Sequence, residues 1–145
     1  SRWPLDPPLS DEGVRRAPDI ARLIQDFAGK DLSRRLTVVS SPYTRCIQTA
    51  ALICQAMGHK GRLLVDLALG EVYGPVVMGG ESAPVATRPL AEMVYEGLPH
   101  GLLRRTKVLG EWPSWPEDLR DARKRYAARF LKYLSRSYKT QRDFL

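Results

Sequence analysis

The residues best suited to chemistry lie in the run 40–50, where a short β-branched segment gives way to a helical pattern. Ser41 is a favourable N-cap residue, and Pro42 suits the first position of a helix. Arg45 then falls in the first turn, where free backbone N–H groups and the helix dipole favour an anion. A guanidinium there adds a planar fork that can bind two phosphate oxygens. We therefore predict a phosphate site at Ser41 and Arg45; the alternative is an ordinary helix start with a solvated arginine.

Two strands and two helices are expected to position this junction. Residues 36–39 are apolar or β-branched throughout and predict a buried strand, and residues 62–66 predict a second one. Helices are expected over 10–29 and 42–57, and Pro18 should kink or split the first of them. The order strand, helix, strand favours a parallel sheet with helices on both faces.

Three segments carry a family resemblance. The run 40–50 reads Ser-Ser-Pro-Tyr-Thr-Arg-Cys-Ile-Gln-Thr-Ala, residues 6–13 read Asp-Pro-Pro-Leu-Ser-Asp-Glu-Gly, and residues 69–74 read Leu-Gly-Glu-Val-Tyr-Gly. In this order they resemble sequence blocks of the histidine phosphatase superfamily, the phosphoglycerate mutase-like phosphatases. The cysteine after Arg45 and the Asp-Pro-Pro-Leu form are most similar to a eukaryotic branch, which includes the phosphatase domains of ubiquitin-associated and SH3-containing proteins. The resemblance implies a three-layer αβα fold with a mainly parallel sheet.

The same resemblance implies an activity and roles for particular residues. It implies hydrolysis of a phosphate monoester, on a small molecule or a phosphoprotein, through a phosphohistidine intermediate. Arg45 would neutralise charge on the phosphoryl oxygens, and Glu71, in the third block, would protonate the leaving oxygen. The spacing from Glu71 to Gly74 is one residue shorter than the common family form. No metal or cofactor is expected, since the sequence has no cluster of ligands at metal-binding spacing.

Neither histidine of the chain matches the two that this chemistry requires. The resemblance implies an Arg-His-Gly motif upstream of Asp6 and a His-Gly pair after the C-terminal helix. His59 follows a glycine typical of a helix C-cap and is expected to be solvated. His100 precedes Gly101, but residues 96–99, Glu-Gly-Leu-Pro, do not suit the buried strand that this pair should end. We therefore expect a domain incomplete at both ends and inactive within these residues; the alternative is a catalytically inactive phosphatase-like subunit of a larger assembly.

The composition is that of an ordinary globular domain, with 43% hydrophobic and 27% charged residues among 145. No run of apolar residues reaches the length of a membrane span, so we expect no transmembrane segment within these residues. We expect one domain over 1–145, in which the glycine- and proline-rich stretch 68–113 is an irregular insertion or lid. Within it, turns are expected over 84–89 and 97–101, with a short helix possible over 89–95.

The two cysteines are expected to be free thiols. Cys46 and Cys54 lie on the helix expected over 42–57, about 12 Å apart along its axis at 1.5 Å per residue. That distance is too long for a disulfide between them. Free thiols favour a reducing compartment, the cytosol or an organelle interior, over secretion.

A basic amphipathic helix is expected over 114–142. Residues 114–117, Ser-Trp-Pro-Glu, have the form of a capping box. An apolar face is expected to be buried, formed by Leu119, Ala122, Tyr126, Phe130 and Leu134. Residues 117–142 contribute +6 to the chain's net charge of +7. The basic face could bind an anionic protein or nucleic acid, and the alternative is a solvated helix face; its residues are Arg120, Arg123, Lys124, Arg129, Lys132 and Arg136.

Overall fold

The computed structural model describes residues 5–29, 35–83 and 100–145. Its centre is a four-stranded sheet in the order β3-β2-β1-β4, in which every neighbouring pair is parallel. The strands are β1 (Leu36–Ser40), β2 (Leu63–Asp66), β3 (Thr106–Leu109) and β4 (Asp143–Phe144). The predicted parallel sheet is thus confirmed, with β1 inside it between β2 and β4.

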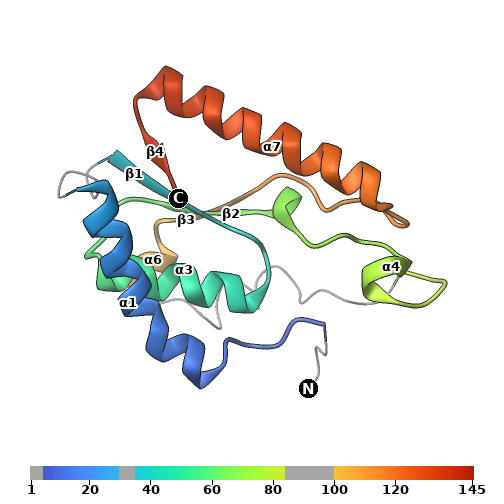
Figure 1. Ribbon diagram of the computed structural model, residues 1–145, viewed down its shortest axis with the longest axis horizontal. Coiled ribbons are helices and arrows are strands. Elements are labelled where there is room, and N and C mark those ends of the chain that lie inside the picture. The colour runs from blue at the N-terminus through green and yellow to red at the C-terminus, as the bar shows by residue number, and fades with distance from the viewer. Residues whose placement is uncertain (1–4, 30–34, 84–99) are drawn as a thin grey trace.

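Helices cover both faces of the sheet (Figure 1). α1 (Asp11–Ala28) and α3 (Thr44–Ala56) lie on one face, and α7 (Leu119–Thr140) crosses the other. This is the three-layer αβα architecture that the sequence predicts. The shorter elements are a 3₁₀ turn η1 (Leu67–Leu69), α4 (Pro75–Met78) and α6 (His100–Leu103).

The main core lies between the sheet and α3. Leu63 and Ile47 have no exposed surface, and Val65 is 1% exposed. Removing an aliphatic side chain of this size from water contributes about 1.5–3 kcal/mol. The cluster that contains Leu63 also includes Leu36 and Val38 of β1 and residues of α3, so it helps to fix the strand-to-helix junction at which Arg45 lies.

α1 is one continuous helix, so the predicted split at Pro18 is wrong. Its N-terminus is capped by Ser10, whose Oγ accepts a hydrogen bond from the Gly13 N–H at 3.2 Å. Ala17 and Ala21, on either side of the proline, are each 1% exposed. Small residues at this spacing let α1 pack closely on the neighbouring layer, and this packing outweighs the hydrogen bond that proline removes.

α7 begins at Leu119, so the predicted capping box is wrong. The N-cap is Asp118, whose side chain accepts a hydrogen bond from the Asp121 N–H at 2.7 Å. The predicted burial of the apolar face is also wrong over most of its length. Ala122 is buried, but Phe130 is 68% and Leu134 is 55% exposed. The side of α7 that faces the sheet carries arginine and tyrosine side chains instead.

The stretch 68–113 is more regular than the sequence predicts, because it contains α4, α6 and β3. The strand β3 is short, and Lys107 interrupts its apolar character, so its pattern gave no strand signal. The turns predicted over 84–89, the first part of the turn predicted over 97–101 and the helix predicted over 89–95 lie outside the described residues. In the part of the chain that the structure describes, no helix combines the length and the apolar character needed to cross a bilayer.

Candidate active site

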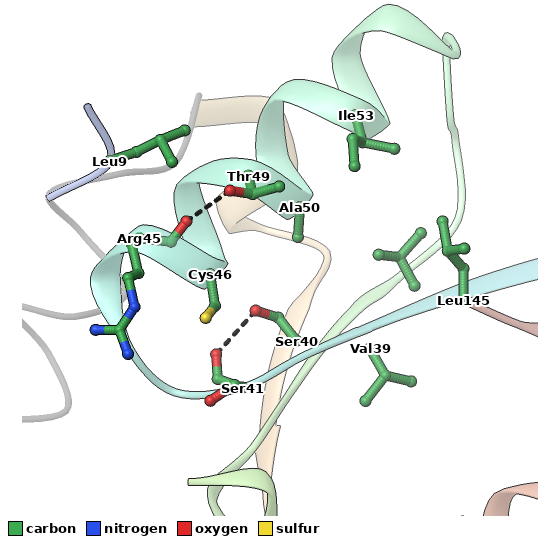
Figure 2. Close-up of a pocket in the computed structure, with 11 residues that line it drawn as sticks. Leu9, Val39, Ser40, Ser41, Arg45, Cys46, Thr49, Ala50, Ile53 and Leu145 are labelled. Carbon is green, nitrogen blue, oxygen red and sulfur yellow. Dashed lines mark hydrogen bonds between the residues drawn. The ribbon is translucent and has the colours of Figure 1, made fainter. Parts of the chain in front are cut away.

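Arg45 lies just beyond the carboxyl end of β1, where the chain turns into α3 (Figure 2). α3 begins at Thr44 and not at Pro42 as predicted, and its N-cap residue is Tyr43, which makes no side-chain cap hydrogen bond. Arg45 is therefore in the first turn of the helix, as the sequence predicts. Ser41 precedes the helix and does not cap it.

A distant carboxylate caps α3 in place of Ser41. The two oxygens of Asp6 accept hydrogen bonds from the Thr44 N–H at 2.7 Å and from the Thr44 hydroxyl at 2.9 Å. Asp6 is only 1% exposed. The Leu9 N–H donates to the Gln48 side chain at 2.7 Å and fixes the same segment along α3. The carboxylate of Asp6 thus occupies the first backbone N–H of the helix, and the side chain of Arg45 supplies the positive charge for an exogenous anion.

A cavity of about 420 Å³ opens beside this turn. Its polar lining comes from Ser40, Ser41, Arg45, Cys46 and Thr49, and the remaining lining residues are apolar. Several of the polar side chains have internal partners. The Ser40 hydroxyl donates to the Ser41 carbonyl and the Thr49 hydroxyl donates to the Arg45 carbonyl, each at 2.8 Å, and the Ser41 hydroxyl is hydrogen-bonded to the Cys46 thiol. The predicted phosphate ligands, Ser41 and Arg45, both line this cavity.

The guanidinium of Arg45 is held by an aromatic ring. Its Cζ lies 4.8 Å from the centroid of Tyr43, and that ring packs edge-on against Trp112 with 6.3 Å between centroids. Such a contact keeps the cation in place without neutralising it. Among the described residues, Arg45 has no carboxylate within ion-pair distance. The charge therefore remains available to an anion in the cavity.

Glu71 lies at the same edge of the sheet but outside the cavity lining. It is exposed, and its Oε1 accepts a hydrogen bond from the Val72 N–H at 3.0 Å. Its charge still acts on the neighbours of Arg45. Burial is the main cause that raises the pKa of Tyr43 to about 12 and also raises that of Cys46, and the carboxylate of Glu71 contributes to both shifts.

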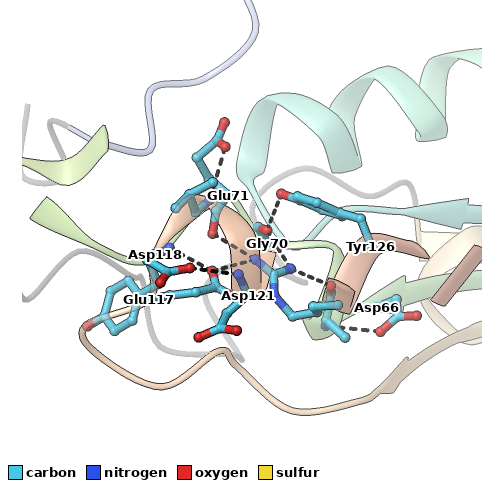
Figure 3. Close-up of polar contacts among 11 residues, drawn as sticks. Asp66, Gly70, Glu71, Glu117, Asp118, Asp121 and Tyr126 are labelled. Carbon is cyan, nitrogen blue, oxygen red and sulfur yellow. Dashed lines mark hydrogen bonds and ion pairs between the residues drawn. The ribbon is translucent and has the colours of Figure 1, made fainter. Parts of the chain in front are cut away.

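α7 fixes the segment that carries Glu71 (Figure 3). The Arg125 guanidinium donates to the carbonyls of Ala68 at 2.6 Å and Gly70 at 3.0 Å, and it forms an ion pair with Glu117 at 2.7 Å. The hydrogen bond from Arg125 is the main cause that lowers the pKa of Glu117. This network, which the sequence did not reveal, ties the end of β2 to the start of α7.

A second anchor lies one helical turn further along α7. Arg129 donates to both oxygens of Asp66, at 2.6 and 2.8 Å, and the Tyr133 hydroxyl donates to the same carboxylate at 2.6 Å. Asp66 has no exposed surface. Burial, followed by the bond to Asp66, raises the pKa of Tyr133, so its hydroxyl keeps the proton that it donates. Arg129, which the sequence places on the solvated basic face, is therefore engaged inside the domain.

The sequence also matches the model of a known protein family. The model of the histidine phosphatase superfamily (branch 1) matches residues 2–142. The chain belongs to the histidine phosphatase superfamily. The parallel sheet with α3 following β1 agrees with a phosphoglycerate mutase-like fold, and membership supports a phosphatase-like function. No curated protein and no solved structure matches the chain.

Neither histidine of this histidine phosphatase domain lies at the Arg45 cavity as the structure describes it. The expectation that His59 is solvated is wrong, since it is 3% exposed. Its backbone N–H donates to the Cys54 carbonyl at 2.8 Å, and the helix-ending glycine before it, Gly58, has a φ of +61°. His100 is the first residue of α6. Residues 96–99, which precede it, lie outside the described part.

The cysteines of the domain are free, and burial raises the pKa of both thiols. The pKa of Cys54 rises to about 11. Since the thiolate is the reactive form, both should be poor nucleophiles near neutral pH. This chemistry argues against a cysteine-based reaction at the Arg45 cavity, although Cys46 lines it.

We expect slow alkylation of both cysteines at pH 7.5. With the folded chain and iodoacetamide, Cys54 should react at least about 100-fold more slowly than free cysteine, because its thiolate fraction is smaller by that factor. The rate should rise until the pH exceeds about 11. Variants Cys46→Ser and Cys54→Ser, followed by mass spectrometry, separate the two sites. Rapid labelling of Cys54 in the folded protein at pH 7.5 would contradict the assignment.

Proposed function

We propose that this domain hydrolyses a phosphate monoester through a phosphohistidine intermediate, and that Arg45 binds the phosphoryl group. The observation that carries the proposal is the guanidinium of Arg45, which lies over Tyr43 beside a cavity and forms no ion pair among the described residues. Its position at the carboxyl ends of parallel strands supports the proposal, because open α/β sheets bind ligands at that edge.

In the proposed reaction, a histidine supplied from outside residues 1–145 attacks phosphorus. A nitrogen–phosphorus bond forms while the bond to the leaving oxygen breaks, and Glu71 donates a proton to that oxygen. Water then attacks phosphorus and gives a proton to the Glu71 carboxylate while the nitrogen–phosphorus bond breaks, which releases inorganic phosphate and restores both the histidine and the acid. Arg45 and the Ser41 hydroxyl donate hydrogen bonds to the phosphoryl oxygens, whose charge is spread in the transition state. The assignment of Glu71 rests on the third sequence block and on its electrostatic influence at Tyr43 and Cys46.

The test is incubation of the full-length gene product with p-nitrophenyl phosphate, followed by quenching and analysis of the protein. We expect release of inorganic phosphate and transient labelling of a histidine with acid-labile, base-stable phosphate. A full-length product that contains both histidine motifs but shows neither signal would contradict the proposal. A full-length product that contains neither motif would favour the alternative, a phosphatase-like interaction module without catalysis.

A further inference from the structure

A second charged cavity opens at the end of the sheet where the parallel strands begin, opposite the carboxyl ends at which Arg45 lies. We call it the strand-entry cavity. Its volume is about 500 Å³. Residues from β1, from the loop before β2 and from the C-terminal end of α7 contribute to its lining. Five cations line it, namely Lys60, Arg62, Arg105, Arg136 and Arg142.

The topology of the sheet explains why the cations gather there. Arg62, Arg105 and Arg142 each directly precede a strand, as does Arg35 at the start of β1. Because all four strands are parallel, their first residues lie at one edge. The register places Leu63 opposite Thr106 and Leu36 opposite Asp143. Arg62 is therefore next to Arg105, and Arg35 is next to Arg142. Adjacent strands are only about 4.8 Å apart, so the backbone positions that carry these arginines are close.

A neighbouring cavity extends the same positive surface under α7. It has a volume of about 320 Å³ and shares Arg62, Leu64 and Arg136 with the strand-entry cavity. Lys107 and Lys132 add two further cations to its lining. Among the cations that line it, Arg129 forms an ion pair with Asp66, and the others form none with the residues that the structure describes.

The remaining charges have no internal counter-ion in the part of the chain that the structure describes. Among the described residues, no aspartate or glutamate lines either cavity, and no ion pair includes a cation of the strand-entry cavity. Two guanidiniums are nevertheless fixed in position. Arg105 donates to the carbonyls of Gly101, His59 and Gly61 at 2.9–3.1 Å, and Arg35 donates to that of Gln141 at 2.9 Å. Carbonyl oxygens orient these groups without cancelling their charge.

We propose that the strand-entry cavity binds a small ligand that carries two or more phosphate groups. Guanidinium groups match phosphate oxygens in pairs, and a row of them suits several linked phosphates. The volume is within the range of small-ligand sites. Among the described residues, Phe144 is the single aromatic side chain that lines the cavity, which disfavours a nucleic acid held by stacked bases. The site is separate from the Arg45 cavity and does not depend on the proposed hydrolysis.

The test is calorimetric titration of the chain with inorganic tripolyphosphate at low salt. Every protein in the series carries Arg45→Gln, which removes the anion ligand at the other end of the sheet. We expect one bound tripolyphosphate per chain. Arg62→Gln and Arg136→Gln, which change exposed residues shared by both cavities, should each weaken binding about tenfold, the effect of losing one charge-assisted hydrogen bond.

Arg123→Gln is the matched control, because it removes the same charge from an exposed residue of α7 that lines neither cavity. Its affinity for tripolyphosphate should stay within about twofold of that of the Arg45→Gln parent, because a distant charge is largely screened by salt. Equal weakening by Arg123→Gln would overturn the proposal, since it would indicate diffuse attraction by the net charge. Absence of binding, equal affinity for orthophosphate, or tighter binding of a single-stranded RNA oligonucleotide would overturn it as well. Circular dichroism melts of each variant separate loss of a ligand contact from loss of the fold.

Discussion

Replacement of Asp66 by alanine should lower the free energy of unfolding by about 3–5 kcal/mol, the range measured when one partner of a buried ion pair is removed. Asp66 is fully buried and accepts hydrogen bonds from Arg129, the Tyr133 hydroxyl and the Ala68 N–H. Its loss leaves the guanidinium of Arg129, which is only 15% exposed, with no counter-charge. Urea denaturation followed by circular dichroism measures the change.

A double-mutant cycle isolates the pair. Arg129→Met alone should also destabilise strongly, because it leaves the Asp66 carboxylate buried without its cation. The double variant should be more stable than the sum of the single changes predicts, since no unpaired charge remains. Glu12→Ala, which removes the partner of Arg15 and Arg16 on the exposed side of α1, should have a far smaller effect. If Asp66→Ala and Glu12→Ala lowered the free energy of unfolding equally, the buried network would not be a main source of the stability of α7.

The same experiment bears on the candidate site, because Asp66 is at the end of β2 and Glu71 follows a few residues later. Arg125 and Arg129 hold this short segment against α7 by contacts at both ends. We therefore infer that α7 positions Glu71 relative to the Arg45 cavity, although it contributes no residue to the lining of that cavity.

The junction at Arg45 could be predicted because its signals are local. A β-branched run followed by Ser-Ser-Pro indicates a buried strand and then a helix, and the spacing places Arg45 in the first turn. The cap could not be found in this way. Asp6 is 38 positions from Thr44 in the sequence, and a nearby serine and proline offered a plausible local start. Local propensity thus located the helix to within two residues, while a tertiary contact fixed its first residue.

The predicted orientation of α7 is wrong because apolar spacing does not define the inner face of this helix. Arg125, Arg129 and Tyr133 follow one another at intervals of four, so they also share one face. Long arginine stems can cover apolar surface while their charged ends reach buried acceptors. The acceptor was present in the sequence as Asp66, an acidic residue that ends an apolar strand. A carboxylate at the end of a buried strand, together with arginines at helical spacing in α7, is the pattern that would have predicted which face of α7 lies against the sheet.

The largest expected effect on activity is that of Arg45→Ala. In the full-length gene product, kcat for a phosphate monoester should fall by about 10²–10³-fold, the usual cost of removing one positioned donor to transition-state charge. Arg45→Lys should recover part of the rate, because it restores the charge but not the planar pair of donors. Steady-state kinetics with p-nitrophenyl phosphate measure both variants.

The geometry at Arg45 separates this effect from a loss of folding. Its guanidinium has one aromatic contact and no ion pair among residues that the structure describes, so Arg45→Ala should cost about 1 kcal/mol of stability at most. Arg15→Ala, on the exposed side of α1, is the control for the loss of one arginine and should leave kcat unchanged. An Arg45→Ala variant that melts like the parent and keeps more than about a tenth of its kcat, far above the range for such a donor, would show that phosphate is bound elsewhere. The same variant with intact fold and lost turnover would instead assign the phosphoryl group to the carboxyl end of β1.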